Sequence, residues 1–178
     1  MLTREDAVLL VVDVQGKLAR LMHEADALFD QIARLVRGAT VLEVPVLATE
    51  QNPDGLGPTV EEVRPHLPSA PMPKMAFSCC GEPAVVEGLE ATGRRQVLLC
   101  GIETHICVYQ TARDLLARGW EVHVVADAVS SRAAGNREVG LEKMRAAGAE
   151  ITSVETALFE MLKAADGPAF REILDIVK

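Results

Sequence analysis

The chain has 178 residues, of which 49% are hydrophobic and 25% charged, a balance typical of a globular protein with its own hydrophobic core. The formal net charge is −8, which argues against binding to nucleic acid or to an anionic membrane, because both select a basic surface. Only 3% of residues are aromatic, so the core must consist of Leu, Val, Ala, Ile and Met.

The four cysteines do not have the spacing of a disulfide framework or of a C-x-x-C site; they are Cys79, Cys80, Cys100 and Cys107. The N-terminal segment lacks the pattern of a signal peptide, and its longest apolar run is too short to span a bilayer. We therefore expect a cytoplasmic protein that makes no membrane contact. No linker, repeat or low-complexity segment interrupts residues 1–178, which predicts a single domain.

Strand-like and helix-like segments alternate along the whole chain. Short apolar runs rich in Val, Leu and Ile predict six strands, at 7–12, 45–49, 72–78, 96–100, 121–126 and 150–152. Helical spacing and helix-boundary residues predict helices at 17–37, 59–63, 83–92, 106–118, 137–147, 154–164 and 168–177. The prolines in the third strand predict an edge position for it.

This alternation predicts an α/β fold, a parallel sheet with helices on both faces. Ligands of such sheets bind beyond the carboxyl ends of the strands, where the strand order reverses. Asp13 directly follows the first strand, and residues 101–107 follow the fourth. With the strand order 3-2-1-4-5-6 these two segments are neighbours, and Lys74 of the third-strand segment can reach the same crevice.

Cys107 is the candidate nucleophile of this crevice. We expect it to open a helix, where unpaired N–H groups and the helix dipole favour the thiolate. Asp13 is a candidate base with Lys74 as its supporting cation, and backbone N–H groups before Cys107 can bind an oxyanion, a set suited to acyl transfer. Taken singly, each residue also has an ordinary interpretation: a buried thiol, a turn carboxylate and a surface lysine.

Five segments carry a resemblance to a known family. They are L-L-V-V-D-V-Q (9–15), A-T-E-Q (48–51), P-K-M-A-F-S (73–78), C-G-I-E-T-H-I-C-V (100–108) and V-V-A-D-A-V-S-S-R (124–132). In this order, and over nearly the whole chain, they resemble the isochorismatase-like cysteine hydrolases, which include nicotinamidases and N-carbamoylsarcosine amidases. The resemblance implies a three-layer α/β/α fold with a six-stranded parallel sheet.

The resemblance also implies roles for individual residues. The family's Cys–Asp–Lys triad corresponds to Cys107, Asp13 and Lys74. A cis peptide bond is implied at Ile102–Glu103, with the N–H groups of Glu103 and Cys107 forming the oxyanion hole. Isochorismatases proper cleave a vinyl ether and lack the cysteine, so its presence here favours hydrolysis of a small amide or carbamoyl C–N bond.

The chain departs from the nicotinamidases at their metal site. The segment T-E-Q-N-P-D-G (49–55) contains no Asp-x-His pair, and His66 is the only histidine between the second and third strands. Zinc takes three or four protein ligands, so we expect neither a metal nor another cofactor. The shortage of aromatic residues also argues against nicotinamide as the substrate.

Three further residues are candidates for contact with a small-molecule substrate. Gln51 either bonds a substrate carbonyl or stabilises its own loop, and Phe77 either lines the pocket or packs in the core. His105 lies near Cys107 in sequence and suggests a Cys–His dyad, although Asp13 already fills the role of base.

Other functions remain open from the sequence. They are a non-enzymatic oligomeric binding or scaffold protein on the same fold, isochorismatase-type hydrolysis, and a thiol-based redox role. Members of the resembled family assemble from several copies, so we expect a homo-oligomer, a dimer or larger.

Overall fold

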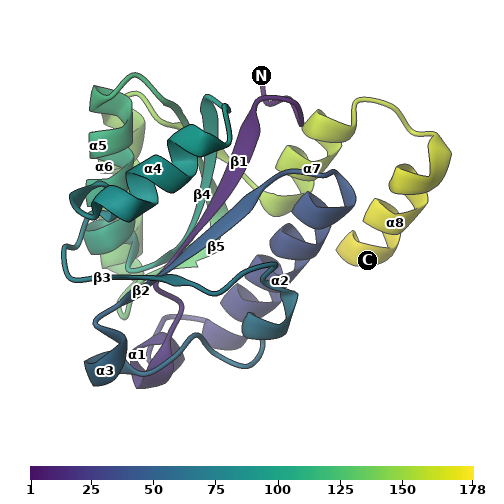
Figure 1. Ribbon diagram of the computed structural model, residues 1–178. Helices are drawn as coiled ribbons and strands as arrows, with labels where there is room; N and C mark the ends of the chain where they lie inside the picture. Colours follow the sequence, from purple (N-terminus) through teal and green to yellow (C-terminus); the bar gives the residue numbers. More distant parts are fainter.

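A single six-stranded sheet forms the centre of the computed structural model, which describes residues 1–178. All neighbouring strands are parallel, in the order β3-β2-β1-β4-β5-β6, which confirms the predicted topology (Figure 1). Their bounds are β1 Ala7–Val12, β2 Val46–Gln51, β3 Met72–Lys74, β4 Gln96–Ile102, β5 Glu121–Ser130 and β6 Glu150–Thr152. β3 is an edge strand, as its prolines predict.

Helices cover both faces of this sheet, so the fold has the predicted three layers. In Figure 1, α4 (Pro83–Ala91), α5 (Tyr109–Ala117) and α6 (Ala134–Ala146) lie on one face. The other face carries α2 (Ala25–Val41) and α7 (Val154–Leu162), with α8 (Gly167–Val177) packed outside them. No helix is both long and apolar enough to cross a membrane.

The central strands supply both cores because successive side chains of a strand point to opposite faces. Leu9 and Val11 of β1 join the core under α2 and α7, whereas Val8 and Leu10 join the core under α4, α5 and α6. Every residue of β1 and β4 is buried. This two-sided burial explains why these strands are continuous apolar runs instead of alternating ones.

Three predicted helices differ from the structure. The segment predicted as one helix at 17–37 is divided into α1 (Gly16–Arg20) and α2, because Glu24 has a left-handed backbone with φ of 53°. The helix predicted at 59–63 is wrong: the helical turns in this loop are α3 (Pro53–Leu56) and a 3-10 turn at Arg64–His66, and Thr59 instead bridges Gln15. The helix predicted from residue 106 starts later, after a wide π-helical turn at Thr104–Val108.

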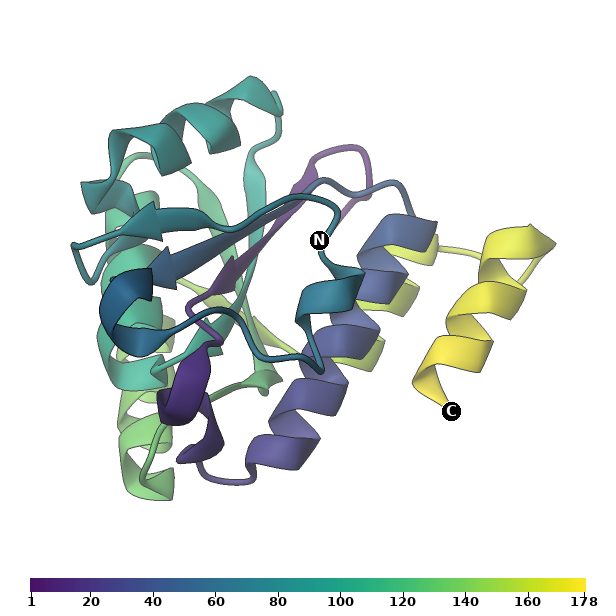
Figure 2. The same cartoon turned by 60° about the horizontal axis from the view of Figure 1, so that its bottom comes forward.

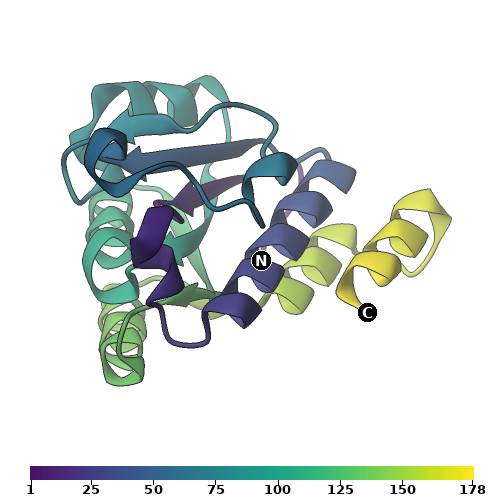
Figure 3. The ribbon, with the colours of Figure 1, turned by 90° about the horizontal axis from the view of Figure 1, so that it is seen from below.

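The carboxyl ends of the parallel strands lie at one edge of the sheet, which comes forward in Figure 2 and is seen from below in Figure 3, where α1 and α3 lie across it. Val12 at the end of β1 is in register with Thr49 of β2 and Gly101 of β4. Gly101 has φ of 113°, and a Cβ built there would lie 2.1 Å from the carbonyl oxygen of Val12. A glycine is therefore required for β4 to approach β1 at this point.

Candidate active site

Asp13 and Lys74 form a buried ion pair at this edge. The Lys74 Nζ lies 2.7 Å from Asp13 Oδ2, and the two side chains are 0% and 4% exposed, respectively. The same ammonium donates hydrogen bonds to Gln51 Oε1 at 2.8 Å and to the carbonyl oxygens of Ala76 and Phe77, each at 3.0 Å. Register brings the lysine here, because Lys74 of β3 is paired with Gln51 of β2.

The two oxygens of the Asp13 carboxylate have different surroundings. Oδ1 accepts a hydrogen bond of 2.8 Å from the buried Thr49 hydroxyl. Oδ2 is buried and lies 2.7 Å from the Lys74 ammonium. Lys74 has three protons for four oxygen neighbours, since it also donates to Gln51 and to two backbone carbonyls. Oδ2 therefore keeps lone pairs that can accept a proton.

Cys107 lies in the turn at Thr104–Val108, which follows β4 and precedes α5. Its side chain joins the core under α4, α5 and α6, and the residue is 8% exposed. Burial, reinforced by the negative charge of Asp13, raises the pKa of the Cys107 thiol to about 12, although the positive charge of Lys74 acts in the opposite direction. Burial beside Asp13 therefore opposes the thiolate that a helix-start position favours.

A cavity of about 110 Å³ joins these groups. Its polar walls come from Asp13, Gln51, Glu103 and Cys107, and its apolar walls are Leu18, Leu56, Phe77, Ile102 and Ile106. Lys74 lies behind Asp13 and does not line the cavity. No group of three or more His, Cys, Asp or Glu side chains is arranged to hold a metal ion, here or elsewhere in the chain.

The three candidate substrate contacts have different positions. Gln51 lines the cavity, but its amide already accepts from Lys74 and donates to the carbonyl oxygen of Met75 at 2.7 Å, so it supports the ion pair. Phe77 lines the cavity and is 56% exposed, so the alternative of core packing is wrong. His105 does not line the cavity, because its Nδ1 lies 2.9 Å from the Ser131 hydroxyl, in a hydrogen bond that holds the ring away.

Ile102 and Glu103 form the wall beside Cys107, and the peptide bond between them is cis. The backbone N–H of Glu103 donates no hydrogen bond within the chain. The Glu103 side chain is held outside the reaction site, since its Oε1 accepts from the backbone N–H of Arg132 at 3.1 Å and from the Arg132 Nε at 3.0 Å. The cavity wall thus contains a free backbone donor.

Several contributors were missed from the sequence. Thr49 orients Asp13, and its hydroxyl also lies 3.6 Å from the Cys79 thiol. Thr49 lies two residues before Gln51 in the A-T-E-Q segment, so in a strand the two side chains point to the same face of the sheet, and this spacing was a usable signal. No sequence pattern identified Leu18, Leu56 or Ile106 as cavity residues, because many apolar residues stand in a loop or in the first turn of a helix.

The fold and the site together define a class: a three-layer α/β protein with an acid, a lysine and a thiol at the carboxyl edge of an all-parallel sheet. Residues 7–156 match the isochorismatase domain. The chain therefore belongs to the isochorismatase-like hydrolase family.

The similarity to known proteins extends over almost the full chain. The secreted isochorismatase effector Isc1 of Phytophthora sojae (strain P6497) is 43% identical over 178 residues, which cover 97% of this chain and 84% of the relative. The MAR1 ribonuclease structure from Caenorhabditis elegans has a TM-score of 0.93 and 35% identity, covering 99% of this chain and 91% of that one. The YcaC gene product of Escherichia coli, described as an octameric hydrolase of unknown specificity, has a TM-score of 0.91 and 25% identity, covering 98% and 89%.

Proposed function

We propose that the protein hydrolyses the C–N bond of a small amide or carbamoyl compound through a thioester on Cys107. Asp13 acts as the general base and acid, and Lys74 holds its carboxylate in place. The observation that carries this proposal is the buried Asp13 carboxylate, paired with Lys74, in the same cavity as the Cys107 thiol.

The neutral thiol requires a base at the moment of attack. As Sγ adds to the substrate carbonyl carbon, Asp13 Oδ2 takes the thiol proton and the carbonyl π electrons move to oxygen. Collapse of this intermediate breaks the C–N bond, while Asp13 gives its proton to the departing nitrogen. Ammonia or an amine leaves, and the acyl group remains on sulfur.

Water completes the cycle. Asp13 takes a proton from the water that adds to the thioester carbonyl, the C–S bond breaks, and the proton returns to Sγ as the carboxylic acid leaves. The N–H groups of Glu103 and Cys107 serve as the oxyanion hole in both halves. The absence of any other acceptor for the Glu103 N–H supports its part in this role.

Turnover of a panel of small amides tests the proposal. Cys107→Ala should lower kcat/KM by at least about 10³-fold and Asp13→Asn by at least about 10²-fold. Cys80→Ala, a buried cysteine that does not line the cavity, is the matched control and should retain activity. Hydroxylamine should trap the acyl group as a hydroxamate in the wild type only. Full amidase activity in Cys107→Ala would exclude the thioester, and inactivity of the wild type on every amide would favour a scaffold function.

Assembly and cellular location are inferred from similar proteins and from the state of the cysteines. We infer a homo-oligomer, a dimer or larger, from the likeness to the octameric YcaC protein. We also infer a reducing, cytoplasmic setting, which agrees with four cysteines that are all free, although the Phytophthora relative is described as secreted.

A further inference from the structure

The cavity contains no positive charge. Its lining residues include no Lys, Arg or His, and of its two acidic residues Glu103 has its carboxylate turned to Arg132. A substrate that carries a carboxylate in addition to its amide would find no cationic partner inside. Burial of an unpaired charge is strongly unfavourable, so the cavity discriminates against such a substrate.

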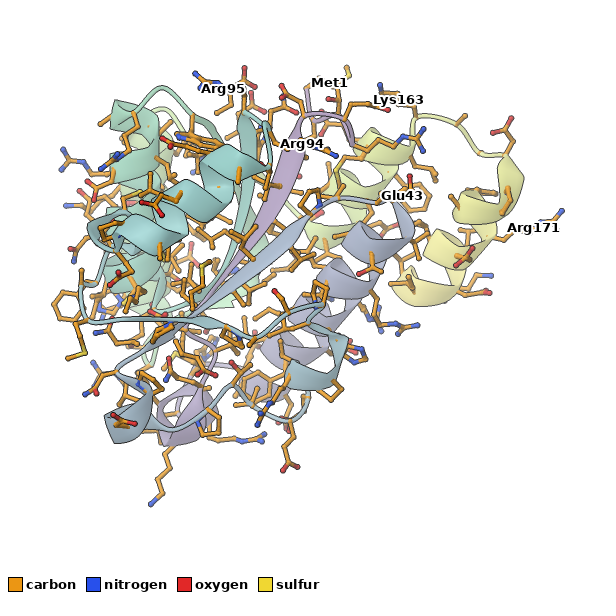
Figure 4. The ribbon with its side chains drawn as sticks, in the orientation of Figure 1. Met1, Glu43, Arg94, Arg95, Lys163 and Arg171 are labelled. Atoms are coloured by element: carbon orange, nitrogen blue, oxygen red, sulfur yellow. The ribbon has the colours of Figure 1, made fainter.

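The cations next to Asp13 and Glu103 are already engaged. Lys74 is surrounded by Asp13 and three hydrogen-bond acceptors, which leaves its ammonium no proton for a substrate. Arg132 donates its Nε to Glu103 and does not line the cavity. Arg94, Arg95 and Lys163 project from the opposite, amino-terminal edge of the sheet (Figure 4).

A positively charged substrate is disfavoured by the same wall. Lys74 neutralises Asp13, and Arg132 neutralises Glu103, so neither carboxylate is an unpaired anion. The remaining wall consists of Leu18, Leu56, Phe77, Ile102 and Ile106, which offer a cation no hydrogen-bond acceptor.

The size of the cavity limits the acyl group. The volume of about 110 Å³ equals that of roughly four water molecules in the liquid. This volume accommodates a small carboxamide with a short side chain.

We propose that the substrate is a small, uncharged, aliphatic amide or carbamoyl compound, selected by an apolar cavity that lacks any cation. This inference rests on the proposed function and specifies the substrate class of the same site. Specificity comes from the wall formed by Leu18, Leu56 and Ile106, and not from a charged recognition residue.

The first experiment compares two amides of matched shape, 3-methylbutanamide and malonamate, in which a carboxylate replaces the branched methyl terminus. We expect kcat/KM for the neutral amide to be at least about 100-fold higher. 2-Amidinoacetamide, the cationic counterpart, should also be disfavoured. Equal or better turnover of malonamate, if dependent on Cys107, would overturn this inference and leave the thioester mechanism intact.

Variants place a charge in the wall. Leu56→Lys should lower the preference for the neutral amide at least about tenfold, because it supplies the missing cation. Leu56→Met controls for the loss of the leucine side chain. Leu21→Lys adds the same charge at a site that is 64% exposed and outside the cavity, and should leave the preference unchanged. An unchanged preference in Leu56→Lys would contradict the assigned wall.

Chemical labelling separates failure of the inference from failure of the proposed function. At pH 9, the Cys107 sulfur displaces chloride from chloroacetamide or chloroacetate, forming a C–S bond as the thiol proton passes to solvent. The ratio of the two rates, divided by the same ratio for glutathione, should exceed about 10 in favour of the neutral reagent. This result would support a cavity for neutral ligands even if no amide is hydrolysed, and a ratio of one or less would overturn it.

Discussion

Replacement of Asp13 by Asn should have opposite effects on the ionisation of Cys107 and on catalysis. Burial and the negative charge of Asp13 raise the pKa of the thiol to about 12, so at pH 8 only about one thiol in 10⁴ is ionised. Asp13→Asn removes the anion and leaves Lys74 as the charged neighbour, which favours the thiolate. We therefore expect the thiolate fraction at pH 8 to rise about tenfold or more.

Turnover should fall in the same variant, since an amide side chain cannot accept the proton of the attacking thiol. The expected loss in kcat/KM is at least about 10²-fold. A site whose aspartate only lowered the pKa of the cysteine would show the reverse pattern, with less thiolate in the variant. The two measurements together therefore distinguish a base that acts during attack from one that ionises the resting thiol.

Alkylation by iodoacetamide at pH 8, followed by peptide mass spectrometry, measures the reactivity of Cys107 separately from the other three cysteines. Cys80 in the same sample is the internal control, because its pKa is raised by burial with no contribution from Asp13. The reasoning would be refuted if Cys107 of Asp13→Asn reacted at the wild-type rate or more slowly while Cys80 was unchanged.

Three further predictions concern stability. Lys74→Met leaves the Asp13 carboxylate buried without its cation and should lower the free energy of unfolding in urea by about 3–5 kcal/mol. The double variant with Asp13→Asn should lose at least about 1 kcal/mol less than the sum of the two single losses. Additive losses would show that the pair is not coupled. Gly101→Ala should cost at least about 2 kcal/mol more than Gly148→Ala, because both positions have positive φ, but only at Gly101 would a Cβ meet backbone atoms; similar losses would contradict the required close approach. Burial lowers the pKa of His123 below 6.5, so the unfolded chain binds its proton first as pH falls, and the free energy of unfolding should decrease below about pH 6.5; a His123→Gln variant with the same pH profile would refute that assignment.

The sequence was sufficient for those features that depend on local pattern. Continuous apolar runs such as 7–12 and 96–100 are typical of strands buried on both faces, and the alternation with helices predicts a parallel sheet. The rule that ligands bind at the carboxyl edge predicts that Asp13, Lys74 and Cys107 lie close together. In the structure, Asp13 and Cys107 line one cavity, and Lys74 forms an ion pair with Asp13.

Helix boundaries were less predictable where tertiary contacts determine them. The left-handed Glu24 divides a segment whose spacing indicates one helix, and the hydrogen bonds from Thr59 to the Glu50 carboxylate hold an extended segment where a helix was expected. Local propensity does not contain these contacts, because the partners lie in other parts of the loop or fold.

The sequence by itself determined the fold class and the identity of the three chemical groups at the site. Only the tertiary structure decided how these groups are charged and directed. The helix-start pattern around Cys107 predicts a thiolate, yet burial beside Asp13 raises the pKa of the thiol, because desolvation depends on every segment that covers the residue. In the same way, the Gln51 amide is bound to Lys74 and the His105 ring to Ser131, partners that approach them only in the folded chain.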